Sequence, residues 1–155
     1  NNINAKKLNS MKTSDIYKLV IDRFKLSLND EEQKRFKSLL PELLKRVQVY
    51  TDLKFEFDWL FQKDFFCKDK NYQLKLQKHN LMLKEIGSRL KECEWSVENI
   101  KNILSQYILD KSLTFKDIGP ILRMALTGKT NSPDLVSIIY ELGCTITVNR
   151  LNYKY

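Results

Sequence analysis

The stretch FKDIGPILRMALTG, residues 115–128, decides the fold of this chain. Its apolar side chains recur at three- and four-residue spacing, which is the period of a helix that buries one face. Gly128 follows them, and glycine is the residue that most readily takes the left-handed conformation after a helix end. We therefore expect a helix over residues 115–126 that stops at Gly128.

The same spacing continues outward through most of the sequence, which only four Gly and three Pro interrupt. It predicts further helices over residues 16–24, from 30 onward, 42–50, 53–61, 72–92 and 97–109, and one between Ser132-Pro133 and Gly143. The aromatic-rich residues 53–61 alternate enough to suggest a strand, but a stripe at four-residue spacing favours a helix. Ile146 and Val148 hint at a strand too short to change the fold class.

Particular residues are expected to set where these helices begin. Ser14, Asn29 or Asp30, Thr51-Asp52 and Ser96 have side chains that can cap a helix N-terminus. Pro41 is predicted to open the helix over residues 42–50, since proline is tolerated in a first turn and breaks an interior.

These elements predict an all-α protein built from two small packed helical subdomains. A chain of 155 residues is long enough to bury a core without disulfide or metal staples. The most polar break, residues 68–71, is the best place to divide it. We therefore expect a first subdomain over 1–68 and a second over 69–155.

The charge balance points to a polyanionic partner but does not establish one. The 27 Lys and Arg exceed the 19 Asp and Glu and leave a net charge of +8. Such a surplus favours nucleic acid, because each neutralised phosphate releases counterions. A Lys-rich composition inherited from the genome explains the surplus equally well.

Several kinds of site are excluded by residue type. Cys67, Cys93 and Cys144 are far apart and His79 is the single histidine, so we expect no disulfide and no metal site. No glycine-rich phosphate loop is present, and the acidic runs fit solvated helix faces, so the chain by itself is not expected to be an enzyme. No apolar run is long enough for a bilayer, which predicts a cytoplasmic protein without a membrane partner.

One family pattern runs through the carboxy-terminal part of the chain. The matching residues are Pro120, Leu122, Arg123, Ala125, Leu126, Thr127, Gly128, Ser132, Pro133, Leu135, Leu142, Gly143, Arg150 and Leu151. In this order they resemble the last helices of bacterial-type glutamyl-tRNA synthetases, which carry Pro-x-Leu-Arg-x-Ala-Leu-Thr-Gly, Ser-Pro-x-Leu, Leu-Gly and Arg-Leu. The resemblance extends upstream to Arg46 and to the pair Phe65-Phe66. It corresponds to roughly the last third of the intact enzyme, so residue 1 is expected to be a fragment start.

The resemblance implies a helical module that binds the tRNA anticodon. The intact enzyme would join glutamate to tRNA with ATP and Mg, on a catalytic domain of the same polypeptide, and is expected to be a monomer. This fragment alone needs no cofactor and is expected to be inactive. Its partner would be tRNA(Glu), and the sequence leaves open whether tRNA(Gln) is a second one.

The resemblance also assigns residues to the anticodon. Arg123 would face the bases, with a planar fork that can hydrogen-bond or stack. Ser132, Pro133, Leu135 and Val136 would form one wall of the pocket. Lys129 is expected to contact a phosphate, and Arg46 lies in the first helical half, near where the third anticodon base is discriminated in some members.

Each assignment has a structural alternative. Arg123 would instead form a salt bridge to a nearby carboxylate, Ser132-Pro133 would simply start a helix, and Arg46 would be a solvent-facing charge. Trp59, Trp95 and most phenylalanines are expected in the core. For the whole chain, the alternatives are a free-standing helical tRNA-binding factor and a protein-interaction scaffold without an RNA role.

Overall fold

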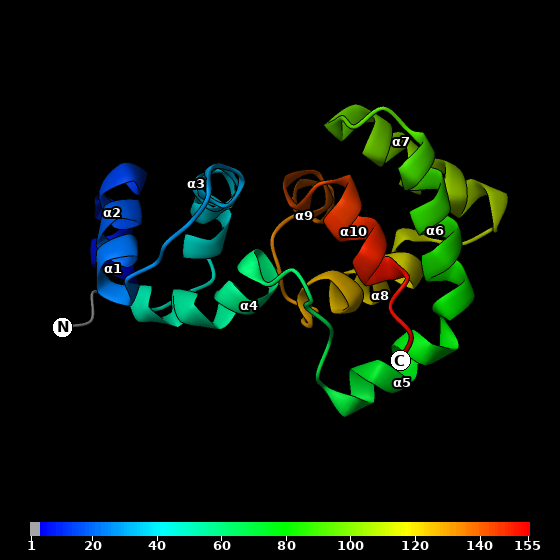
Figure 1. The fold of residues 1–155 in the computed structure, drawn as a ribbon, viewed down its shortest axis with the longest axis horizontal. Coiled ribbons are helices and arrows are strands. Elements are labelled where there is room, and N and C mark those ends of the chain that lie inside the picture. Colours follow the sequence, from blue (N-terminus) through cyan, green and yellow to red (C-terminus); the bar gives the residue numbers. More distant parts are fainter. Residues whose placement is uncertain (1–3) are drawn as a thin grey trace. The chain divides into compact units, whose positions relative to one another are not determined.

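A computed structural model describes residues 4–155 and confirms the all-α class. Over that range it has ten α-helices and one 3₁₀ helix, and its only β pairing is an isolated bridge between Asn4 and Val49. The chain divides into two compact units, Asn1–Gln62 and Lys63–Tyr155 (Figure 1). Each unit has its own buried core and is described by itself.

The first unit is a small helical cluster in which three helices and the 3₁₀ turn pack around the longest helix. Its elements are α1 (Ala5–Ser10), α2 (Thr13–Phe24), α3 (Asp30–Leu44), the 3₁₀ helix η1 (Tyr50–Glu56) and α4 (Phe57–Phe61). Helix α3 contacts all the others. The unit is thus organised by one helix and its buried stripe.

Helix α3 begins where the sequence places a cap. The Asn29 side chain accepts from the Glu32 amide at 2.8 Å, and the Glu32 carboxylate accepts from the Asn29 amide at 3.0 Å. This reciprocal pair satisfies two amides that no helical partner reaches. The buried face of the helix carries Phe36, Leu39 and Leu40, and the Phe36 ring meets the edges of other aromatic rings of the unit.

Three predicted helix starts in this unit are wrong. Pro41 does not open a helix but lies inside α3, which continues to Leu44. Proline removes one helical hydrogen bond, and the buried Leu39, Leu40 and Leu43 around it keep the helix intact. Ser14 lies one residue inside α2, whose cap position is Lys12 without a side-chain bond.

The third wrong helix start is the one predicted for residues 53–61. These residues are helical as predicted, but the helix begins earlier, and its first part is a 3₁₀ helix. The 3₁₀ helix begins at Tyr50, and the Asp52 carboxylate accepts from the Val49 amide at 3.4 Å.

The second unit is a bundle of six helices. Its elements are α5 (Lys70–Lys78), α6 (Asn80–Glu92), α7 (Val97–Asp110), α8 (Phe115–Thr127), α9 (Leu135–Leu142) and α10 (Cys144–Leu151). Helix α10 lies beside α6, with its other contacts to α8 and α9 (Figure 1). Gly87 of α6 faces Leu151 of α10, and a Cβ there would make ordinary van der Waals contact with the Leu151 Cβ at 3.6 Å. Ser96 caps α7 as predicted, accepting from the Asn99 amide at 3.1 Å.

The helix predicted over residues 72–92 is two helices, broken at His79. The His79 backbone leaves the helical region, and its ring Nδ1 lies 2.8 Å from the Lys75 carbonyl oxygen. Two leucines of this segment are on the surface, with Leu74 60% and Leu81 72% exposed. The spacing predicts a buried stripe of Leu74, Leu81, Ile86 and Leu90, whereas the structure buries Leu76, Leu83, Ile86 and Leu90.

The division between the units falls at residues 62 and 63, whereas the polar break suggested 68 and 69. The difference follows from Phe65 and Cys67, which are buried within the second unit. The Arg150 guanidinium lies 4.7 Å from the Phe65 ring centre, and the Cys67 amide donates to the Tyr155 hydroxyl at 2.8 Å. Residues 63–68 are thus tied to the bundle that follows them.

Each unit buries one arginine against a backbone carbonyl near a helix end. Arg35 donates to the Leu60 carbonyl at 2.6 Å, and Arg150 donates to the Leu126 carbonyl at 2.7 Å. The last carbonyls of a helix have no helical donor, so a buried guanidinium there satisfies a group that would otherwise be unpaired.

Candidate functional site

The sequence-predicted site residues of the second unit surround the turn between α8 and α9. Gly128 has φ 72°, as its place after the helix predicted, and its amide donates to the Met124 carbonyl at 2.9 Å. The Thr127 hydroxyl donates to the Arg123 carbonyl at 2.8 Å and accepts from the Lys129 amide at 3.2 Å. Thr127 and Gly128 therefore end the helix and shape the turn.

Arg123 lies one turn before that helix end, and its side chain is half-buried. Its guanidinium runs back along α8 over Gly119, where a Cβ would stand 3.3 Å from Arg123 Nη1. Within residues 4–155 no hydrogen bond or ion pair of this side chain is found, so the salt bridge considered as an alternative has no counterpart there. The guanidinium therefore passes beside Gly119, and its donors are without a partner among the described residues.

The residues expected to form a pocket wall divide into buried and accessible ones. Ser132, Pro133 and Leu135 are buried, with Leu135 only 1% exposed. Val136 and Lys129 are half-buried. The three buried side chains are not accessible to a ligand. A ligand would therefore contact the backbone of the turn, Val136 and Lys129.

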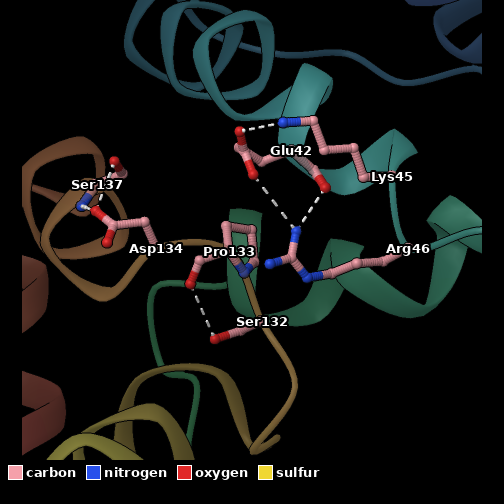
Figure 2. A network of polar contacts seen from close by, with 7 residues as sticks. All are labelled: Glu42, Lys45, Arg46, Ser132, Pro133, Asp134 and Ser137. Atoms are coloured by element: carbon pink, nitrogen blue, oxygen red, sulfur yellow. Dashed lines mark hydrogen bonds and ion pairs between the residues drawn. The ribbon is translucent and has the colours of Figure 1, made fainter.

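The expected helix start at Ser132-Pro133 is wrong by two residues. Helix α9 begins at Leu135, and Asp134 is its cap, accepting from the Ser137 amide and hydroxyl, both at 3.0 Å (Figure 2). The Ser132 hydroxyl points instead to the Pro133 carbonyl, 3.4 Å away. Asp134 is also a good capping residue, and an Asp three residues before Ser137 was the sequence signal that would have located the cap.

Arg46, the candidate in the first unit, lies in the turn after α3 and bonds to Glu42 of that helix. Its Nη1 donates to the Glu42 carbonyl at 2.7 Å and lies 3.7 Å from the Glu42 carboxylate, which also bonds Lys45 at 3.0 Å (Figure 2). The Lys45 hydrogen bond and charge, with a smaller contribution from Arg46, lower the pKa of the Glu42 carboxyl. The structure thus gives Arg46 a local partner.

No cluster suited to a metal ion is found among residues 4–155. Over the same range no helix combines the length and the apolar character that a membrane span requires.

The profile of the anticodon-binding domain family matches residues 15–154, which is nearly the whole chain. The chain therefore belongs to that family, in agreement with the pattern found around Arg123.

Its relatives include glutamate–tRNA ligases of bacteria. Glutamate–tRNA ligase 1 of Bartonella henselae is 31% identical over 127 residues, which cover 81% of this chain and 26% of that protein. The glutamate–tRNA ligase of Coprothermobacter proteolyticus is 26% identical over 113 residues, covering 73% of this chain and 24% of that protein. The chain thus spans about a quarter of the length of these curated relatives.

The fold has a solved counterpart. A crystal structure of a glutamate tRNA ligase from Elizabethkingia meningosepticum, in complex with its amino acid, superposes with a TM-score of 0.71 and 21% identity. The match covers 96% of this chain and 30% of that one, so the helical fold is shared with a segment of a larger protein.

Proposed function

We propose that this chain is the anticodon-binding part of a glutamate–tRNA ligase. It would hold the anticodon of tRNA(Glu) while a catalytic domain of the same polypeptide attaches glutamate to that tRNA, using ATP and Mg. Membership of the anticodon-binding domain family and the names of the bacterial relatives support this proposal. A role as a free-standing RNA-binding factor or a protein-interaction scaffold has no such support.

The observation that carries the proposal is the state of Arg123. Arg123 is half-buried, its guanidinium passes beside Gly119, and it has no hydrogen-bond or ion-pair partner among the described residues. A half-buried guanidinium with free donors suits a planar acceptor from outside the chain. The unpaired bases of an anticodon loop expose such acceptors on their edges.

The neighbouring turn suits base groups better than phosphate. Asp134 places a carboxylate at the start of α9, where it accepts from the Ser137 amide. That negative charge offsets the attraction of a helix N-terminus for anions. We therefore assign phosphate contact to Lys129, and the wall of the base site to the turn backbone and Val136.

The test compares Arg123→Ala with Lys129→Ala for binding to tRNA(Glu) and to the same tRNA with a changed middle anticodon base. Loss of a base contact costs about 1–3 kcal/mol of discrimination, so Arg123→Ala should lose most of the preference between the two tRNAs. Lys129→Ala should keep the preference and show a shallower salt dependence, because a phosphate contact acts on all sequences alike. Equal preference in wild type and Arg123→Ala would contradict the assignment.

Two further parts of the proposal have direct tests. Because the chain has no phosphate-binding loop, we expect it to bind tRNA without activating glutamate, which ATP–pyrophosphate exchange measures. Charging of tRNA(Glu) and tRNA(Gln) by the intact enzyme would decide between one substrate tRNA and two. We also propose a cytoplasmic monomer, in line with three cysteines that are all unpaired.

A further inference from the structure

A phenylalanine lies on the surface of the second unit beside the candidate arginine. Phe115 is the first residue of α8 and is 45% exposed. It precedes Gly119 by one helical turn and Arg123 by two, so the three residues follow one another along the helix. A single exposed phenylalanine is ordinary on a protein surface. Phe115 differs from such a residue because its ring lies against Gly119.

Gly119 brings the phenyl ring and the guanidinium together. A Cβ at Gly119 would stand 2.9 Å from Phe115 Cε1 and 3.3 Å from Arg123 Nη1, and the first distance is shorter than real Cβ contacts. Both groups therefore use the space that a side chain at Gly119 would fill. Phe115 Cε1 and Arg123 Nη1 are therefore no farther apart than the sum of these two distances, and no side chain at Gly119 stands between them.

Hydrogen bonds in the first turn of α8 order the backbone that carries Phe115. The Asp117 carboxylate accepts from the Thr114 amide at 2.7 Å and from its hydroxyl at 3.0 Å. These bonds lower the pKa of the Asp117 carboxyl and close the capping box. Phe115 is thus held on an ordered helix start rather than on a fraying end.

We propose that Phe115 and Arg123 together form a seat for one unstacked base of the anticodon, with the Phe115 ring stacking on the face of the base. Arg123 then donates to its edge. This inference rests on the proposed function and adds Phe115 and Gly119 to it. An aromatic face accepts any base, whereas a guanidinium fork selects among acceptor patterns, so the two groups divide affinity and selectivity between them.

The test measures the affinity of the 155-residue chain for the anticodon stem-loop of tRNA(Glu). Phe115→Leu keeps apolar bulk but removes the π face, and it should weaken binding about tenfold. Phe115→Tyr keeps the ring and should bind within about twofold of wild type. Leu109→Ala is the matched control, since Leu109 is a 71% exposed apolar residue on α7 of the same unit.

A second variant keeps the test independent of any loss of folding. Gly119→Ala favours the helix, because alanine is the better helix former, yet its methyl group must displace the Phe115 ring. It should therefore weaken binding while leaving the thermal midpoint unchanged or higher. A stem-loop with an abasic residue at the stacked anticodon position should bind wild type and Phe115→Leu alike.

The possible failures are distinguishable. If Phe115→Leu and Gly119→Ala bind as wild type does while Arg123→Ala loses its base preference, the seat is wrong and the proposed function stands. If Phe115→Leu weakens the abasic probe as much as the intact one, the ring acts through the fold and the seat is likewise wrong. If wild type shows no preference for the anticodon sequence, the proposed function fails and the seat fails with it.

Discussion

The buried arginines of the two units make the same kind of hydrogen bond, whereas their more exposed arginines differ in whether they have a polar partner. Inside, Arg35 and Arg150 each donate to a carbonyl near a helix end. Outside, Arg46 is tied to Glu42 one turn away, whereas Arg123 has packing contacts and no polar partner among residues 4–155. The two arginines that the resemblance places near the anticodon, Arg123 as the main candidate and Arg46 as the weaker one, are therefore physically different groups.

A guanidinium that already has a partner in the protein and one that has none differ in what they must release to bind RNA. The Nη1 group of Arg46 is engaged by Glu42, so RNA would meet its remaining donors or compete for Nη1, although an exposed pair of this kind stabilises the protein little. Arg123 passes beside Gly119 and has no polar partner to release among the described residues. Of the two, Arg123 is the stronger candidate for reading a base.

The largest effect is expected inside the second unit. Arg150→Met should lower its free energy of unfolding by about 3 kcal/mol, from the lost bond to the Leu126 carbonyl and the lost contact with the Phe65 ring. Urea unfolding followed by circular dichroism measures this. Lys101→Met, at an exposed position of α7, is the control and should change little. A loss below about 1 kcal/mol would mean that the carbonyl finds water instead.

A smaller effect tests the caps that begin α9 and α3. Asp134→Ala should cost about 1 kcal/mol, because the Ser137 amide loses its acceptor, and Asn29→Ala should cost a similar amount in the first unit. Hydrogen exchange of individual amides would locate each loss. The comparison between units fails if Asp134→Ala accelerates exchange in α3, or Asn29→Ala in α9.

A weaker, pH-dependent effect is expected at the end of the chain. Burial raises the pKa of Tyr155 to about 12, so the folded state favours the neutral hydroxyl that accepts from the Cys67 amide. That stabilisation is complete below about pH 10 and is lost as the pH rises through about 12. Tyr155→Phe, slightly less stable at pH 8, should therefore approach and then exceed wild type across this window. Parallel stability curves for the two proteins would be the contrary result.

The smallest effect is expected at Arg46. Arg46→Ala should leave stability unchanged within error, since its bonds to Glu42 are on the surface. It should weaken tRNA binding far less than Arg123→Ala and leave base preference intact. A loss of preference as large as that of Arg123→Ala would show that RNA displaces Glu42, and it would erase the distinction drawn between the two arginines.

The parts of the fold that were predictable are those with a local cause. Asn29 and Ser96 cap their helices and Gly128 is left-handed, because each depends on a few neighbouring residues. The predictions at Pro41 and His79 failed for opposite reasons. A helix was expected to begin at Pro41 but continues through it, and a helix was expected to continue through His79 but breaks there. Both outcomes depend on which leucines reach a core, and that is fixed by residues distant in sequence.

The candidate site shows the same limit. The pattern around Arg123 located the turn between α8 and α9, but it did not reveal that Ser132 and Leu135 are buried. The pattern also did not include Phe115. Most phenylalanines were expected in the core, but Phe115 is 45% exposed in the structure. Sequence spacing assigns residues to a helix face, whereas exposure depends on whether another helix covers that face.

The buried bond between Arg150 and the Leu126 carbonyl has a consequence for how quickly RNA is captured. Together with the hydroxyl of Thr127 and the left-handed Gly128, it orders the end of α8 before any ligand arrives. A surface ordered in advance loses little conformational entropy on association, so the cost of ordering falls on the RNA loop. The association rate should then follow the flexibility of that loop and the attraction between charges, and vary little with motions of the protein.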